Sequence, residues 1–191
     1  MLSLVKGTPT PLDNNGTPVR TFIAAVGWDV TAKGKKGLGG ALARRKGVDL
    51  DLAVVALDGA KQPLACCGFD TPDVMGMHHT GDNKSGKGAG DDETAHVDLT
   101  KLPGQVQQLL VAATSFKGEN FDKVGALYYR IIDTSSGSEV DITGEVYVPI
   151  VAQYNAVILA KVVRQGDGWR IETRGDLGRA TYWRDLANLR R

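Results

Sequence analysis

The apolar residues of this chain come in short, often β-branched runs that are separated by turn-forming residues. Runs of this length and composition predict strands rather than long helices. Six or more short strands with few helices favour two packed sheets over repeated βαβ units. We therefore predict a mainly β fold, a two-sheet β-sandwich, with strands at Phe22–Val26, Leu50–Leu57, Leu109–Ala113, Leu127–Ile132, Val146–Ala152 and Val157–Val163.

The connections between these runs predict one hairpin and one or two short helices. Residues 157–165 and 169–174 flank the short turn Gly166–Gly168, which is typical of a β-hairpin. Thr100–Leu110 has a capping threonine and an early proline, so it is a candidate helix. At the C-terminus, Arg179–Arg190 places Tyr182, Leu186 and Leu189 at helical spacing, and we predict a helix there.

The length of 191 residues predicts one domain over residues 1–191. The apolar runs fall short of the roughly 18 residues that a membrane span needs, and prolines interrupt the region where a signal peptide would be apolar. We therefore expect a soluble, cytoplasmic protein without a covalent membrane anchor. Residues 31–47 are rich in glycine, lysine and arginine, and we expect a flexible basic loop.

Charge is segregated along the chain although the formal net charge is only +1. Residues 48–100 contain ten acidic and three basic residues, whereas residues 1–47 contain two acidic and eight basic ones. A nucleic-acid-binding stripe would show the opposite excess, so we expect no nucleic-acid partner. The acidic centre indicates a hard-cation site, an interaction surface or a solvated loop.

The most informative stretch is the glycine-rich acidic segment at residues 81–93. Asp82, Asn83, Asp91, Asp92 and Glu93 bracket its glycines and offer oxygen ligands. Ca²⁺ takes six to eight oxygens, and it would offset the repulsion among the crowded carboxylates. An EF-hand does not fit, because Lys84 and Gly86 occupy positions that should donate oxygens and Lys87 replaces the turn glycine.

A second acidic pair lies in Val48–Leu52. Residues i and i+2 of a strand point to one face, so Asp49 and Asp51 lie together, opposite Leu50 and Leu52. The pair either faces solvent at a strand end or converges with the glycine-rich segment on a shared cation. Asp29 is a further candidate contributor.

Other chemistries receive less support from the sequence. The glycine-rich segment lacks the Gly-Lys-Ser/Thr of a phosphate loop and continues into acidic residues, so a phosphorylated ligand would have to bind through a metal. His78 and His79 point apart in an extended segment, although one of them could approach the acidic loop. We find no catalytic constellation. Cys66 and Cys67 are expected on alternating faces of a strand with one of them buried, or else as a reactive thiol pair.

The three tryptophans, Trp28, Trp169 and Trp183, are expected to lie in one shared core.

Three blocks of this sequence resemble the TerD family of bacterial tellurite-resistance and stress-response proteins. They are Val26–Asp29, Asp49–Asp51 and Thr80–Glu93, the last followed by Val97-Asp98-Leu99 and Leu102-Pro103. The opening Leu2-Ser3-Leu4-x-Lys6-Gly7 is also similar to the family's, so the likeness spans most of the chain.

The resemblance implies a β-sandwich that binds one or two Ca²⁺ ions and has no established enzymatic activity. Its ligand set, carried over to this chain, is Asp29, Asp49, Asp51, Asp82, Asn83, Asp91, Asp92 and Glu93, with carbonyls near Gly86, Gly88 and Gly90. It also implies action through other stress-response proteins of the same system, in assemblies at the inner face of the membrane. The alternatives are a metal-dependent enzyme or binder of a phosphorylated small molecule, and an interaction module whose acidic loop is only solvated.

Overall fold

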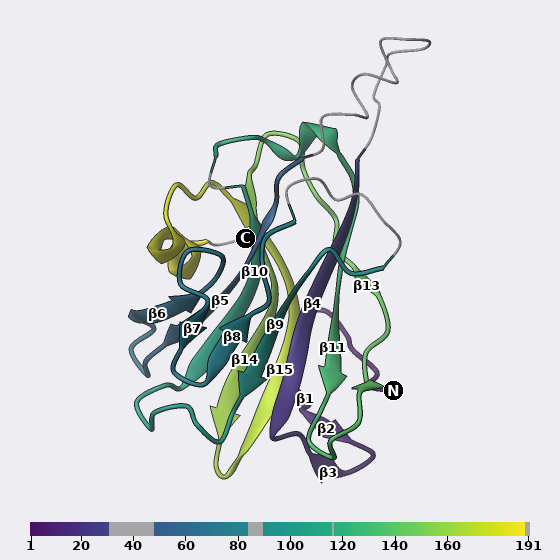
Figure 1. Ribbon diagram of the computed structural model, residues 1–191, viewed down its shortest axis with the longest axis vertical. Coiled ribbons are helices and arrows are strands. Elements are labelled where there is room, and N and C mark those ends of the chain that lie inside the picture. Colours follow the sequence, from purple (N-terminus) through teal and green to yellow (C-terminus); the bar gives the residue numbers. More distant parts are fainter. Residues whose placement is uncertain (31–47, 84–89, 116, 190–191) are drawn as a thin grey trace.

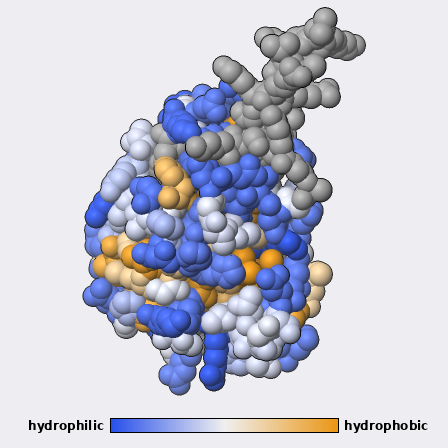
Figure 2. Space-filling view, in the orientation of Figure 1, coloured by the Kyte–Doolittle hydropathy of each residue, from blue (hydrophilic) through white to orange (hydrophobic). Residues whose placement is uncertain are grey.

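Antiparallel strands dominate the computed structural model, which describes residues 1–30, 48–83, 90–115 and 117–189 (Figure 1). Two large sheets face each other, and both contribute to one apolar core. The mainly β prediction is therefore confirmed. The expected basic loop at residues 31–47 lies outside the described residues. Figure 2 shows a mostly hydrophilic face crossed by one apolar band.

The first sheet has six strands within the described part of the chain. Its central strands, β14 and β10, are each paired on both sides. In order across the sheet the strands are β1 (Thr10–Pro11), β15 (Gly168–Gly178), β14 (Ala156–Gln165), β10 (Gln108–Thr114), β5 (Asp51–Leu57) and β6 (Pro63–Cys67). The predicted hairpin is confirmed, because β14 and β15 pair antiparallel up to Gln165 and Gly168.

The second sheet has seven strands among the described residues. Its order is β12 (Val140–Asp141), β11 (Val124–Asp133), β4 (Thr21–Val30), β9 (Glu93–Asp98), β8 (Met77–His79) and β7 (Asp73–Val74), with β13 (Val146–Tyr147) also pairing with β11. A small hairpin joins β2 (Asp13–Asn14) to β3 (Thr17–Pro18). The strand expected over Val146–Ala152 is thus mostly wrong, since only its first two residues pair.

Alternation along the strands explains how the core forms. On β4, Phe22, Ala24, Val26 and Trp28 point inward, and the inward residues of β5 and β11 meet them. Trp28 is 3% exposed in this core and Trp169 packs against it, whereas Trp183 joins a separate cluster on the outer face of the six-stranded sheet. The expectation of one shared tryptophan core is therefore wrong for Trp183.

The predicted C-terminal α-helix over Arg179–Arg190 is a shorter 3-10 helix, η2 (Trp183–Asn188). Tyr182 is extended and half exposed, so it precedes the helix and does not extend its apolar face. Leu186 is fully buried against the outer face of the six-stranded sheet. Asn155 fixes the segment that leads into η2, because its side chain exchanges two hydrogen bonds with the backbone of Ala180.

The helix predicted over Thr100–Leu110 is also wrong. Asp98 accepts hydrogen bonds from the backbone and hydroxyl of Thr100, which forms a tight turn, and β10 begins at Gln108. The apolar run that starts at Leu109 is instead a strand buried on both faces. A short 3-10 helix that the sequence analysis did not predict, η1 (Phe121–Lys123), precedes β11.

The adjacent cysteines lie at the end of β6 and are both buried. Cys67 joins the core between the sheets and Cys66 joins the outer cluster, so the expected alternation is confirmed. The sequence predicted burial of only one of the two thiols, whereas both cysteines are buried. Burial raises the pKa of both thiols to about 12, with smaller contributions from the charges of Asp70 and Asp73.

This shift predicts low thiol reactivity in the native protein. With the pKa raised from 9.0 to about 12, the thiolate fraction at pH 8 falls about a thousandfold, and only thiolates react. We expect iodoacetamide to modify native protein about a thousandfold more slowly than urea-unfolded protein. The stabilisation from the protonated thiols is complete below pH 9 and is lost as the pH rises through 12. Equal alkylation rates, followed by mass spectrometry, would contradict this account.

Candidate metal centre

The acidic residues gather at one end of the sandwich, where two ladders bring separate segments together. The start of β9 pairs with β4 through Glu93 and Val26, and the start of β5 pairs with the end of β10 through Asp51 and Thr114. Because β4 and β9 lie in one sheet and β5 and β10 in the other, this end joins both layers (Figure 1).

Asp49, Asp51 and Asp82 form the closest group of carboxylates among the described residues. One oxygen from each lies within 4.8 Å of the other two. Asp49 and Asp51 are 8% and 6% exposed, and Asp82 is exposed at the edge of the loop. Asp49 precedes β5, which begins at Asp51, so the two residues do not share a strand as expected. Their carboxylates nevertheless lie together, and both residues are buried rather than directed to solvent.

One oxygen of this group lacks a partner. Asp49 Oδ1 is buried and accepts no hydrogen bond from the described residues. A buried carboxylate oxygen without a partner is costly, because it has lost its hydration without replacement. The set of carboxylate oxygens, with one of them unpartnered, fits a hard cation such as Ca²⁺.

Lys117 supplies the positive charge that faces this group in the structure. Its Nζ donates to the other oxygen of Asp49, Oδ2. The hydrogen bond to Asp49 and the negative charges of Asp49, Asp51 and Asp82 raise the pKa of Lys117. Its side chain is 64% exposed, so it can move away into solvent. Lys117 follows β10 in a loop, and no pattern in the sequence predicts its contact with Asp49.

Glu93 joins the two segments that carry the carboxylate group. Its Oε2 accepts from the backbone N–H of Leu52 at 2.7 Å, and its Oε1 accepts from the backbone N–H of Asn83 at 3.0 Å. The side chain is 1% exposed. Both oxygens of Glu93 thus accept backbone N–H groups directly next to Asp51 and Asp82. The expected role of Glu93 as a cation ligand stays a prediction.

His79 completes the surroundings of Glu93. It is the inward-pointing member of the histidine pair, and its Nε2 lies 3.3 Å from Glu93 Oε2, although no hydrogen bond forms there. Its Nδ1 accepts the N–H of Gly81, so the proton of the neutral ring is assigned to Nε2, facing Glu93. The expectation that one histidine approaches the acidic loop is confirmed.

Asp92 and Trp28 connect the loop to β4. Asp92 accepts from the backbone N–H of Trp28 at 2.9 Å and from the side chain of Asn83 at 2.9 Å. The indole of Trp28 donates in turn to the carbonyl of Val48, next to Asp49. Burial raises the pKa of Asp92, the Trp28 N–H opposes this, and the charges of Glu93, Asp29 and Asp91 add to it.

Asp91 is directed to a different set of partners. Arg130 Nη2 donates to its Oδ2 at 2.5 Å and Nε to its Oδ1 at 2.8 Å, and Arg130 also pairs with Asp141. These bonds raise the pKa of Arg130. Tyr128 donates to Asp91 from the strand next to β4. The structure therefore separates Asp91 from the group of Asp49, Asp51 and Asp82.

The remaining predicted ligands are only partly placed. Asp29 is exposed at the end of β4, close enough to Asp92 to raise its pKa. Gly90 is exposed with φ +98, which favours glycine. Gly86 and Gly88 lie outside the described residues, so the predicted contribution of their carbonyls remains a prediction.

The sequence is similar to one family of known proteins over nearly its whole length. The TerD domain model matches residues 1–189. Tellurium resistance protein TerZ of Serratia marcescens is 32% identical over 142 residues, covering 73% of this chain and 72% of that protein. Stress response protein SCP2 of Bacillus subtilis (strain 168) is 26% identical over 206 residues, covering 97% and 96%. These relatives are named as resistance or stress proteins and not as enzymes.

Solved structures agree on the fold. The crystal structure of SAV2460, a protein of unknown function, superimposes with a TM-score of 0.63 at 19% identity, over 92% of this chain and 100% of that one. A homologue of the telluride resistance protein TerD, SCO6318 from Streptomyces coelicolor A3(2), gives 0.59 at 15% identity, over 81% and 88%. Within the described residues, no helix is long and apolar enough to cross a bilayer.

The double role of Glu93 predicts a measurable cost for Glu93→Gln. A glutamine amide can accept from only one of the two N–H groups, and its NH₂ would face the other. Leaving one buried donor unpaired costs about 1–3 kcal/mol. We expect urea unfolding to show this loss, whereas Glu119→Gln, a partly exposed surface position, should change stability by less than about 0.5 kcal/mol. Equal stability of the two variants would refute the role given to Glu93.

Gly27 predicts a second effect, because a Cβ at this position would overlap the ring of Tyr128. Gly27→Ala must therefore push Tyr128 away, and with it the contact to Asp91. We expect a loss of about 1–3 kcal/mol in the free energy of unfolding, as overpacking produces. Replacing Tyr128 by Ala in the Gly27→Ala background should remove the overlap, so that the two changes are not additive. Strict additivity would contradict the steric account.

Proposed function

The chain belongs to the TerD domain family, and on that basis we propose that it is a calcium-binding, non-enzymatic stress-response protein of the cytoplasm. It would act through partner proteins, namely other stress-response proteins of the same system, in assemblies at the inner face of the membrane. The names of its relatives, tellurium resistance and stress response proteins, support the biological role. The carboxylate group at the end of the sandwich supports the cation.

Two observations on one residue carry the proposal. One oxygen of Asp49 lies within 4.8 Å of oxygens from Asp51 and Asp82, and its buried Oδ1 has no hydrogen-bond partner among the described residues. Three carboxylates in one place repel one another, and a divalent cation relieves that repulsion more fully than the single charge of Lys117. A cation here would bind Asp49, Asp51 and Asp82. Carbonyls of Gly86, Gly88 and Gly90 would complete one site.

The donor chemistry favours calcium over its common competitors. The candidate ligands are carboxylate, amide and carbonyl oxygens, without the sulfur or paired nitrogen donors that zinc prefers. Ca²⁺ accepts six to eight oxygens in flexible geometry, whereas Mg²⁺ demands a near-octahedral shell and keeps its waters. Glu93 and Asp92 would orient the ligand segments, and Asp29 with Asp91 would belong to a second site only if Arg130 released Asp91.

The proposal predicts calcium binding that depends on the paired aspartates of residues 49–51. Chelator-stripped protein titrated with Ca²⁺ in a calorimeter should bind one or two ions, with Mg²⁺ much weaker. At a hundredfold excess over Kd, one ion should stabilise the fold by about 2.7 kcal/mol. The double variant Asp49→Asn/Asp51→Asn should lose that gain. Asp167→Asn, an exposed aspartate in the β14–β15 turn at the opposite end, should keep it.

Two outcomes would contradict the proposal. If the double variant responds to Ca²⁺ as the unchanged protein does, the ion binds elsewhere. If neither protein binds Ca²⁺, the acidic loop is only a solvated surface. Turnover of phosphate esters that requires Mg²⁺ or Mn²⁺ and disappears in the double variant would instead favour the metal-dependent enzyme.

A further inference from the structure

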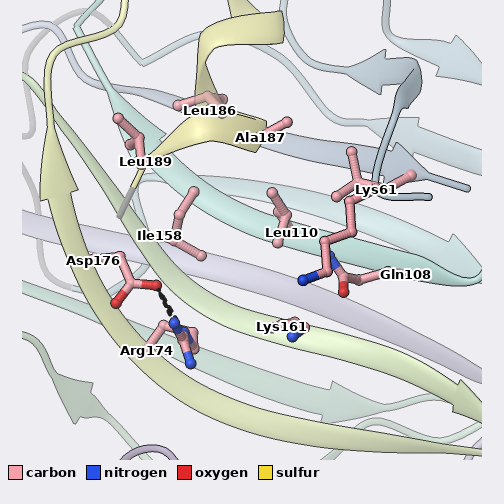
Figure 3. Close-up of a pocket in the computed structure, with 11 residues that line it drawn as sticks. Lys61, Gln108, Leu110, Ile158, Lys161, Arg174, Asp176, Leu186, Ala187 and Leu189 are labelled. Carbon is pink, nitrogen blue, oxygen red and sulfur yellow. Dashed lines mark hydrogen bonds and ion pairs between the residues drawn. The ribbon is translucent and has the colours of Figure 1, made fainter. Parts of the chain in front are cut away.

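A groove lies on the outer face of the six-stranded sheet, away from the acidic end. It has a volume of about 520 Å³, within the range of small-ligand sites. Figure 3 shows Leu110 and Ile158 on its strand floor, pointing toward Leu186 and Leu189 of the C-terminal segment. The groove is thus apolar along one side, between the central strands and η2.

The opposite side of the groove is basic. Lys61, Lys161 and Arg174 line it, and Asp176 is the acidic residue of the lining. Arg174 forms ion pairs with both Asp176 and Glu172 at 2.5 Å, so the charge of these two carboxylates is balanced in part by the guanidinium. Neither Lys61 nor Lys161 has a carboxylate of the described residues within ion-pair distance. Two ammonium groups therefore border the apolar floor without forming an ion pair with the described residues.

The backbone at Lys61 gives a second observation. Lys61 has φ +64 in the β5–β6 turn, a conformation that glycine or asparagine adopts with less strain. Asp58 fixes this turn by accepting the backbone N–H groups of Ala60 and Gln62. Figure 3 shows the side chain of Lys61 descending toward Gln108 at the groove. The turn does not need a lysine, and strain of this kind is often found where a side chain has a function.

The positive side also extends beyond the groove. A second hollow of about 330 Å³ shares Lys161 and is lined by Arg164 and Arg170, with Glu172 as its acidic residue. The guanidinium of Arg164 is held 4.4 Å above the ring of Trp169 and donates to the carbonyl of Val106. A negatively charged group near Lys161 would therefore have further cations close by, and the carboxylate opposite Lys161, Glu172, is itself paired with Arg174.

From this combination we infer that the groove binds a single-chain anionic amphiphile. Its phosphate or carboxylate would lie between Lys61 and Lys161, and its alkyl chain would lie along Leu110 and Ile158 under Leu189. An extended peptide fits less well, because β10 and β14 are paired on both sides and offer no free strand edge. The inference does not depend on calcium, since the floor residue Gln108 and the candidate cation site lie at opposite ends of β10.

The test uses hexyl, octyl and decyl phosphate as monomers, titrated calorimetrically in the presence of a calcium chelator. We expect saturable binding of one molecule, with affinity rising about fourfold for each added methylene. Inorganic phosphate should bind far more weakly. Decylammonium should not compete, because its charge is repelled by the two lysines. Leu189→Ser, at the groove wall, should reduce the dependence on chain length.

Two lysine variants separate binding from folding. Lys61→Asn removes the charge but suits the positive φ, so it should keep the unfolding temperature or raise it while weakening decyl phosphate binding. Combined with Lys161→Gln, it should weaken binding about tenfold or more. Lys101→Gln, which removes an exposed lysine near β9, is the matched control and should bind normally.

Three results would overturn the inference. The first is unchanged affinity in the Lys61→Asn/Lys161→Gln variant. The second is equal binding of decylammonium and decyl phosphate, which would show that the groove binds alkyl chains without selectivity for negative charge. The third is adsorption to phosphatidylglycerol vesicles without binding of monomeric alkyl phosphates, which would mean that the positive face meets a lipid surface and not one amphiphile.

Discussion

The acidic end of this protein depends on one buried carboxylate. Glu93 projects from β9 into the space between the sheets and accepts one backbone N–H from Leu52 and one from Asn83. Leu52 lies beyond the part of β5 that pairs with β6, so its N–H takes this carboxylate as its partner. By satisfying donors from both sides, Glu93 ties the acidic loop to β5. The positions of Asp51 and Asp82, each next to one of these donors, follow from that constraint.

Around this link the carboxylates divide into groups with different partners. Asp49, Asp51 and Asp82 face Lys117, whereas Asp91 faces Arg130 and Asp92 accepts N–H groups. The glycine of the Val26–Asp29 block also has a physical reason, because the Tyr128 ring covers Gly27. The block therefore positions the site through Trp28 and Gly27, and only its last residue is a candidate ligand. At the far end of β10 the surface is basic and apolar, so the groove proposed to bind an anion is separate from the candidate cation site.

Much of the fold could be predicted from the sequence, because strand alternation and turn residues are local signals. The runs at Phe22–Val26 and Val157–Val163 are strands. The proximity of the Asp49 and Asp51 carboxylates was also predicted, although Asp49 precedes the strand that begins at Asp51. The helix predictions were wrong where tertiary contacts decided the outcome. Leu109 lies in β10, a strand that pairs with a neighbour on each side. The C-terminal segment forms only a short 3-10 helix, in which Leu186 is the buried residue. The roles of Lys117 and Arg130 could not be predicted, since each meets its carboxylate across a long separation in the chain.

The most direct test of the central claim is a crystal structure determined with calcium present. The account predicts an ion about 2.3–2.6 Å from Asp49 Oδ1 and from oxygens of Asp51 and Asp82, with Lys117 turned into solvent and the Asp91–Arg130 pair intact. An ion held by Asp91 and Asp92, with Arg130 displaced and Lys117 still bound to Asp49, would contradict it.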